Sequence, residues 1–136
     1  MKLNPDCIRD ILLAIESQVP EGNHRIQDSM NIDAFLKNEY TRKYDEKEII
    51  YVLLRLEEAG LINSSHKLYS GGSVVHFWVS SLTFSGHQYL EKIRDDGHWK
   101  QIKTIGSKIG DFSLSAIEKI AEGVTSAAIS RFFNTP

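Results

Sequence analysis

At residues 53–62 the chain reads LLRLEEAGLI, and this stretch decides the fold. Leu53 and Leu56 stand three residues apart, which places both on one side of a helix and predicts packing on a core. Gly60 is the residue type that most often follows the last turn of a helix in left-handed backbone. Leu61 and Ile62 then begin a strand, so the stretch predicts a helix that turns at Gly60 directly into a sheet.

Three helices are expected up to this turn. Asn4 followed by Pro5 is typical of a helix start, and apolar side chains at helical spacing continue the first helix. The expected elements are a helix over residues 5–18, a short strand near residues 25–30, a short helix capped by Asn31, a polar turn at residues 38–44 and a strong helix that begins near Asp45.

A β-hairpin and further helices are expected after the turn. Two β-rich runs flank Ser70-Gly71-Gly72-Ser73, and a Gly-Gly pair is typical of a hairpin turn. Residues 64–67 and the Gly-Gly turn are expected to form a flexible tip. The remaining expected elements are a helix capped by Thr83 or Ser85 and ended by Asp96-Gly97, a helical continuation from Trp99 to about Gly106 with hinges at Gly106 and Gly110, and an amphipathic helix over residues 113–133.

This order predicts a mainly α fold with a small β-hairpin, a winged helix-turn-helix with extra C-terminal helices. The alternative is a general α+β domain with a small sheet. Residues 1–110 are expected to form the winged-helix domain. Residues 111–136 are expected to form a C-terminal amphipathic helix that serves dimerisation or packs on its own domain.

Two short motifs resemble those of winged-helix regulators. In that superfamily an L-x-x-L-x-x-A-G-L-[IV] run leads from the third helix into the first strand of the wing, and residues 53–62 match it. The run Leu82-Thr83-x-x-Gly86 resembles the start of the helix that follows the wing. The resemblance implies a winged-helix fold.

A closer resemblance, over about residues 1–105, is to the DUF2513 family of uncharacterised bacterial and prophage proteins. The resemblance implies a winged-helix fold and brings no established activity. It is carried by the opening MKLNPDCIRDILLAIE, the central YVLLRLEEAGLI and the segment at residues 82–103. In that last segment the positions that match the family pattern are Leu82, Thr83, Gly86, His87, Leu90, Ile93, Arg94, Trp99 and Lys103.

Composition limits the class of protein. A chain of 136 residues with 41% apolar residues predicts one globular domain. With 16 Lys and Arg against 18 Asp and Glu, the net charge of −2 excludes a protein that coats nucleic acid through bulk charge. No apolar run of about 18 residues and no signal-like start occur, so a cytoplasmic protein without a membrane partner is expected.

Enzyme chemistry is not expected. The single Cys7 excludes a disulfide framework and a multi-cysteine zinc site. No spacing typical of a metal site, a phosphate loop or a nucleophile with its base occurs, so no cofactor is expected. His87 is interpreted as a structural residue, and Asp95-Asp96 as a feature of a helix C-terminus.

The first functional hypothesis is binding of double-stranded DNA by the helix that precedes Gly60, in a regulator of bacterial or prophage genes. Phosphate contacts position such a protein, and polar side chains on the helix reach the bases. The expected DNA-contacting residues are Arg42, Lys43 and Lys67 at phosphates and Lys47, Tyr51 and Arg55 nearest the groove.

The charge of this region favours a second hypothesis. Residues 41–60 carry four basic and five acidic side chains, and phosphates repel carboxylates. The alternative is therefore a protein–protein interaction module, such as a phage-encoded adaptor or inhibitor, on a winged-helix scaffold without DNA binding.

The C-terminal helix needs a partner for its apolar face. A homodimer is the preferred interpretation, and packing on its own domain is the alternative. The polar face carries Glu118, Lys119, Glu122 and Arg131, a balanced set that differs from the basic face typical of membrane-surface helices.

Overall fold

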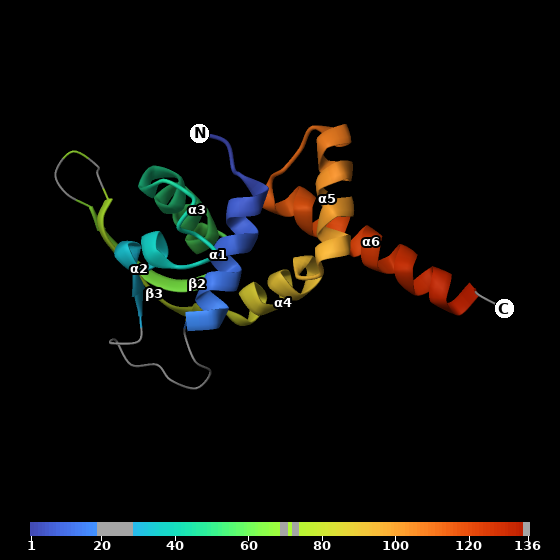
Figure 1. Ribbon diagram of the computed structural model, residues 1–136, viewed down its shortest axis with the longest axis horizontal. Helices are drawn as coiled ribbons and strands as arrows, with labels where there is room; N and C mark the ends of the chain where they lie inside the picture. The colour runs from blue at the N-terminus through green and yellow to red at the C-terminus, as the bar shows by residue number, and fades with distance from the viewer. Residues whose placement is uncertain (19–28, 69–70, 72–73, 135–136) are drawn as a thin grey trace. The chain divides into compact units, whose positions relative to one another are not determined.

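The computed structural model describes residues 1–18, 29–68, 71 and 74–134. The described part contains helices α1 to α6 and a three-stranded antiparallel sheet (Figure 1). The expected mainly helical class with a small sheet is therefore confirmed. The chain divides into two compact units, Met1–His87 and Gln88–Pro136. The domain division after residue 110 stays a prediction.

The first unit begins with three helices that pack beside the strands (Figure 1). Each cap side chain accepts a hydrogen bond from a backbone N–H of the first turn, which satisfies a donor that the helix itself leaves unpaired. The helices begin where they are expected: α1 (Pro5–Gln18) after Asn4, α2 (Ile32–Lys37) after Asn31 and α3 (Glu46–Glu58) after Asp45.

The core of this unit lies between apolar stripes at helical spacing. Full burial of each large aliphatic side chain contributes about 1.5–3 kcal/mol, so the stripes rather than helix propensity stabilise these helices. The fully buried large aliphatic residues of α1 and α3 are Ile8, Ile11, Leu12 and Ile15 on the first and Ile49, Val52, Leu53 and Leu56 on the second.

The junction after α3 has the hydrogen bonds of a Schellman motif. Gly60 has a φ of 73°, and its N–H donates to the carbonyl of Glu57 over 3.1 Å. The N–H of Leu61 donates to the carbonyl of Leu56 over 3.0 Å, and both of these leucines are buried. These bonds satisfy the last carbonyls of the helix and lead the chain into the sheet, as the sequence predicts.

The sheet has the strand order β1-β3-β2, with β1 at Met30–Asn31, β2 at Ile62–Leu68 and β3 at Val74–Leu82. The predicted hairpin is confirmed. Residues 64–67 were expected at its flexible tip, and that expectation is wrong, because they pair with β3 inside β2. Gly71 lies in the turn with a φ of 110°, while Gly72 and most of the short strand expected near residues 25–30 lie outside the described residues.

Thr83 and Gly86 explain the start of α4 (Phe84–Ile93). The Thr83 hydroxyl donates to the carbonyl of Gly60 over 2.6 Å and accepts from the N–H of Gly86 over 3.0 Å, so it caps the helix and holds it to the end of α3. A Cβ on Gly86 would lie 2.0 Å from the carbonyl oxygen of Leu61, so only glycine, which has no Cβ, fits at this position.

The boundary between α4 and α5 differs from the expectation. Asp96-Gly97 was expected to end a helix, and Asp95-Asp96 to belong to a C-terminus. Instead α4 ends at Ile93, and Asp95 is the N-cap of α5 (Asp96–Ile109), where its carboxylate accepts from the N–H of His98 over 2.8 Å. Carboxylates favour a helix N-terminus through the helix dipole, and Asp95 accepts one of the backbone N–H groups that the first turn of the new helix leaves unpaired.

Gly106 is not a hinge. It lies inside α5, where a Cβ would meet the ring of Phe112 at 2.3 Å, so the glycine makes room for an aromatic side chain from the following turn. Gly110 is the left-handed C-cap of α5, with a φ of 80°. Gly106 therefore allows Phe112 to pack on α5, and Gly110 ends that helix.

The last helix, α6 (Leu114–Asn134), packs on α5 and agrees with the expected span. Ile117, Ala121 and Val124 are buried, whereas every residue from Ile129 to Asn134 is exposed. At 1.5 Å per residue, the 21 residues of α6 extend about 10 Å beyond the length of the 14-residue α5. Within the described residues no helix combines the length and apolarity that crossing a membrane requires.

Candidate nucleic-acid interface

The turn between α2 and α3 is held by buried polar side chains. Asn38 accepts from the N–H of Tyr40 over 2.8 Å, and the Thr41 hydroxyl donates to the carbonyl of Phe35. Both Asn38 and Thr41 are buried, so this turn is rigidly defined by its own hydrogen bonds. Arg42 follows directly and is exposed.

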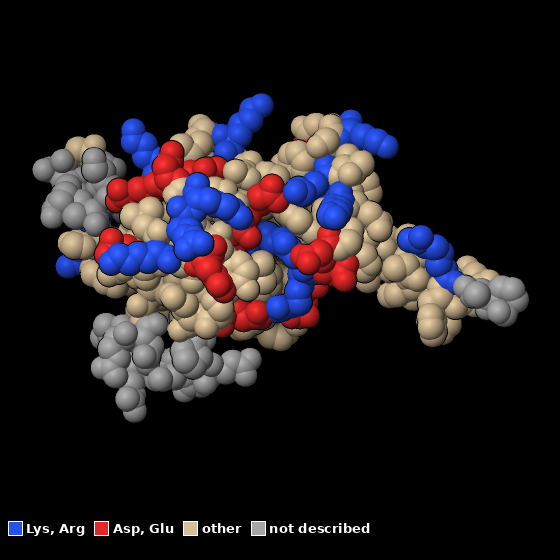
Figure 2. Space-filling view, in the orientation of Figure 1, with Lys and Arg blue, Asp and Glu red and all other residues tan. Residues whose placement is uncertain are grey.

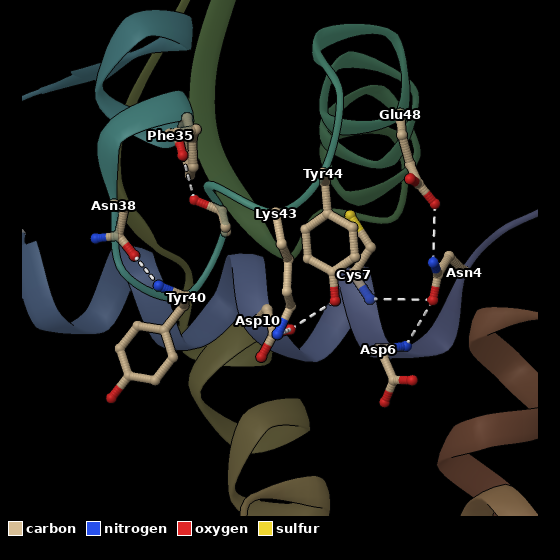
Figure 3. Close-up of polar contacts among 11 residues, drawn as sticks. Asn4, Asp6, Cys7, Asp10, Phe35, Asn38, Tyr40, Lys43, Tyr44 and Glu48 are labelled. Atoms are coloured by element: carbon tan, nitrogen blue, oxygen red, sulfur yellow. Dashed lines mark hydrogen bonds and ion pairs between the residues drawn. The ribbon is translucent and has the colours of Figure 1, made fainter.

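Lys43 and Tyr44 point toward α1 (Figure 3). The Tyr44 hydroxyl donates to the Asp10 carboxylate over 2.6 Å, and the Lys43 ammonium lies 3.0 Å from the same carboxylate oxygen. Burial, followed by the bond to Asp10, raises the pKa of the Tyr44 phenol, which therefore stays a donor. Lys43 thus fastens the turn to α1, and its ammonium remains largely exposed beside that pair.

The carboxylates of α3 have structural partners. Asp45 caps the helix, accepting from the N–H of Glu48 over 2.8 Å. Glu48 accepts from the Asn4 amide on α1 over 2.9 Å (Figure 3). Glu58 pairs with Arg55 over 2.8 Å. These three carboxylates are therefore held by partners within the fold, and that of Glu58 is paired with a cation.

Glu57 joins α3 to the hairpin. Its carboxylate accepts from the Ser64 hydroxyl over 2.7 Å and lies 2.9 Å from Nδ1 of His66, both on β2. The His66 ring stacks on Phe77 of β3 with centroids 5.4 Å apart. We call Glu57, Ser64 and His66 the clamp. No local pattern predicts the clamp, because its residues belong to different elements that become neighbours only in the folded chain.

The outward side of α3 carries the remaining candidates. Lys47 and Tyr51 lie one turn apart on the side of α3 opposite the buried stripe, and Arg55 follows one turn after Tyr51. Lys47 is exposed and pairs with no acid in the part of the chain that the structure describes. The Arg55 guanidinium lies over the Tyr51 ring, 5.4 Å from its centroid, while its Nε is buried without a hydrogen-bond partner among the described atoms.

Lys67 lies apart from this group on the hairpin. It is exposed and pairs in register with His76 of β3. Because side chains alternate along a strand, Lys67 points to the face of the sheet opposite the one on which His66 contacts α3. The structure therefore brings Lys47, Tyr51 and Arg55 together on α3 and leaves Lys67 on the far face of the hairpin.

Charges of both signs are mixed on the drawn surface of the first unit. Figure 2 shows Lys and Arg interspersed with Asp and Glu, and no large area of one sign on this face. Among the described residues, no three His, Cys, Asp or Glu side chains gather to hold a metal ion. Binding of DNA to this face would therefore depend on particular side chains more than on a broad positive field.

Comparison with known proteins identifies relatives. The family described as "Hypothetical protein (DUF2513)" matches residues 2–111. A protein of Haemophilus influenzae named "Uncharacterized protein" is 35% identical over 131 residues, which cover 96% of this chain and 100% of that protein. No solved structure matches the chain.

Proposed function

This chain belongs to the DUF2513 family, and we propose that it is a winged helix-turn-helix protein that binds double-stranded DNA as a regulator of bacterial or prophage genes. The order α1-β1-α2-α3-β2-β3, with α3 leading directly into a hairpin, supports the winged-helix assignment. In this proposal α3 is the recognition helix and the hairpin is the wing.

One observation carries the DNA-binding proposal: the partners of the carboxylates on α3. Asp45, Glu48, Glu57 and Glu58 are each engaged by a cap, a hydrogen bond or an ion pair. Lys47 and the preceding Arg42 are exposed and pair with no acid among the described residues. The cations are thus available to phosphates although the region carries more acids than bases.

A titration of full-length protein against a DNA duplex at several salt concentrations tests the proposal. We expect binding at about 50 mM salt that weakens steeply as salt rises. Arg42→Ala and Lys47→Ala should each weaken binding and lower the salt slope by about one phosphate contact. Lys119→Ala, the same change at an exposed position of α6, should leave the affinity and the salt slope unchanged. No binding at about 50 mM salt overturns the proposal.

The proposal includes a homodimer formed through α6. Ile129, Phe132 and Phe133 are 52%, 77% and 77% exposed, and they lie within five residues of one another at the end of the helix. Clustered exposed apolar side chains favour an interface over bare solvent. A dimer would also present two recognition helices to one duplex.

A protein–protein interaction module is the second candidate function. The mixed charges of the drawn surface favour it, because they provide no broad positive field for DNA. Affinity capture from a host lysate tests it beside the duplex titration. A stoichiometric protein partner without DNA binding supports this candidate, and clear DNA binding without such a partner contradicts it.

A further inference from the structure

The face of the sheet that points away from α3 carries a tryptophan beside a groove. In register, Trp78 lies between Asn31 of β1 and Ser65 of β2, at the centre of the three strands. A groove of about 510 Å³ adjoins it. The described lining of the groove consists of Ser29, Asn63, Ser64, Ser65, Trp78 and Ser80.

One side of the indole is already covered by a flat ring. The His76 imidazole stacks on Trp78 with centroids 5.4 Å apart and an angle of 16° between the ring planes. His76 borders a second, smaller groove of about 170 Å³ together with Trp78 and Asp33, and it does not belong to the described lining of the larger one. The larger groove borders Trp78 together with Ser80, two residues further along β3, whereas His76 precedes Trp78 by two residues.

The described lining offers a specific chemistry. It combines one aromatic face with the hydroxyls of Ser29, Ser65 and Ser80 and an amide, and it contains no charged side chain, while the Ser64 hydroxyl is bonded to Glu57. The Asn63 amide donates to Ser81, and the Ser80 hydroxyl donates to the backbone carbonyl of Asn63, so hydrogen bonds orient these groups. A flat apolar ring surface with neutral donors and acceptors around it complements a planar ring that has polar edges.

We propose that this groove binds a small planar heteroaromatic molecule of nucleobase or nucleoside size. The ligand stacks on the face of Trp78 opposite His76, which extends the stack by one ring, and it hydrogen-bonds with Ser65 and Asn63. The volume of the groove falls in the range of small-molecule sites. The inference uses neither α3 nor Arg42 and Lys47, on which the DNA-binding proposal rests.

Calorimetric titration of the full-length chain with adenosine, guanosine, cytidine, uridine and thymidine tests the proposal, with glucose as a non-aromatic ring of similar polarity. We expect at least one nucleoside to bind and glucose not to bind. Trp78→Ala should weaken nucleoside binding about tenfold or more, because stacking on an aromatic side chain supplies this much affinity, and Trp78→Phe should retain most of it.

A second variant keeps the test decisive if Trp78→Ala does not fold. Ser65→Leu fills the groove beside the indole and should also weaken binding about tenfold or more, whereas Ser107→Leu, the same change at an exposed position of α5, should not. Far-ultraviolet circular dichroism checks that each variant is folded. The proposal is overturned if no nucleoside binds up to its solubility limit, if glucose binds instead, or if the groove variants bind like the unaltered chain.

Discussion

Gly86 is held so closely against the start of β2 that no side chain fits. A Cβ at this position would lie 2.0 Å from the backbone oxygen of Leu61, and neither backbone can withdraw without breaking the bonds of Thr83. We expect Gly86→Ala to lower the free energy of unfolding by about 1–3 kcal/mol, the usual cost of overpacking. Urea denaturation followed by circular dichroism measures it.

Gly123→Ala is the matched control. Gly123 lies inside α6, and a Cβ there would meet no atom within 4 Å. Alanine should raise the free energy of unfolding by about 0.5–1 kcal/mol, because it loses less backbone entropy than glycine in a helix. If both variants lose the same free energy of unfolding, the close approach of Gly86 to Leu61 is not the cause of the loss.

The thiol of Cys7 makes stability depend on alkaline pH. Burial, followed by the nearby carboxylates of Glu48, Asp10 and Asp45, raises its pKa from 9.0 to about 12. The folded chain therefore holds a proton that the unfolded chain releases, and this contribution to stability is lost as the pH rises from about 9 to about 12. Cys7→Ala should reduce the fall in unfolding free energy across this window by about 1.4 kcal/mol per pH unit.

Denaturant titrations at several pH values between about 8 and 12 measure this slope. Tyr44 and Tyr89 also have a raised pKa, so part of the alkaline loss should persist in the variant. An unchanged slope in Cys7→Ala would mean that the thiol ionises equally well in the folded chain.

At the scale of elements, the clamp of Glu57, Ser64 and His66 ties α3 to the hairpin. A double-mutant cycle of Glu57→Ala and Ser64→Ala should give a coupling energy of about 0.5–1.5 kcal/mol, the usual net value of a hydrogen bond. The cycle is measured by urea denaturation. Ser65 lies on the opposite face of β2. In a parallel cycle, Ser65→Ala should therefore show no coupling to Glu57→Ala.

Elements with strong periodic patterns could be predicted from the sequence. The starts of α1, α2 and α3 and the turn at Gly60 follow from caps and spacing that act within a few residues. The break between α4 and α5 was predicted wrongly, because Gly97 suggests a helix end whereas Asp95 and Asp96 favour a helix start. The cap bond from the N–H of His98 to Asp95 and the burial of Trp99 and Ile102 together place the start of the second helix.

The candidate interface was predictable only as a set of residue types. Arg42 and Lys47 could be singled out by their place before and on α3. The charge balance of this helix is misleading, since Glu48 and Glu57 bind partners outside it, Asn4 at the start of α1 and Ser64 on β2. Contacts of this kind depend on tertiary structure, which local patterns do not contain.

At the scale of the whole molecule, the exposed end of α6 predicts self-association. The Phe132→Ser, Phe133→Ser double variant should change a homodimer into a monomer, because each ring loses the apolar area that another copy would bury. Sedimentation velocity over a range of concentrations measures the mass. Phe84→Ser, at a ring that is 79% exposed outside α6, should leave the dimer intact. A monomeric unaltered chain at all concentrations would contradict the prediction.

The stem of the hairpin is closed at its base by the pairing of Ile62 with Leu82 and by the bond from the N–H of Thr83 to the carbonyl of Leu61. Both strands are thus anchored independently of the distance that the chain travels between Leu68 and Val74. Doubling the length of such a connection costs only about 0.6 kcal/mol. The length of this connection can therefore vary at little cost in stability. A tag or a dye can be inserted at the same place while the strands keep their pairing.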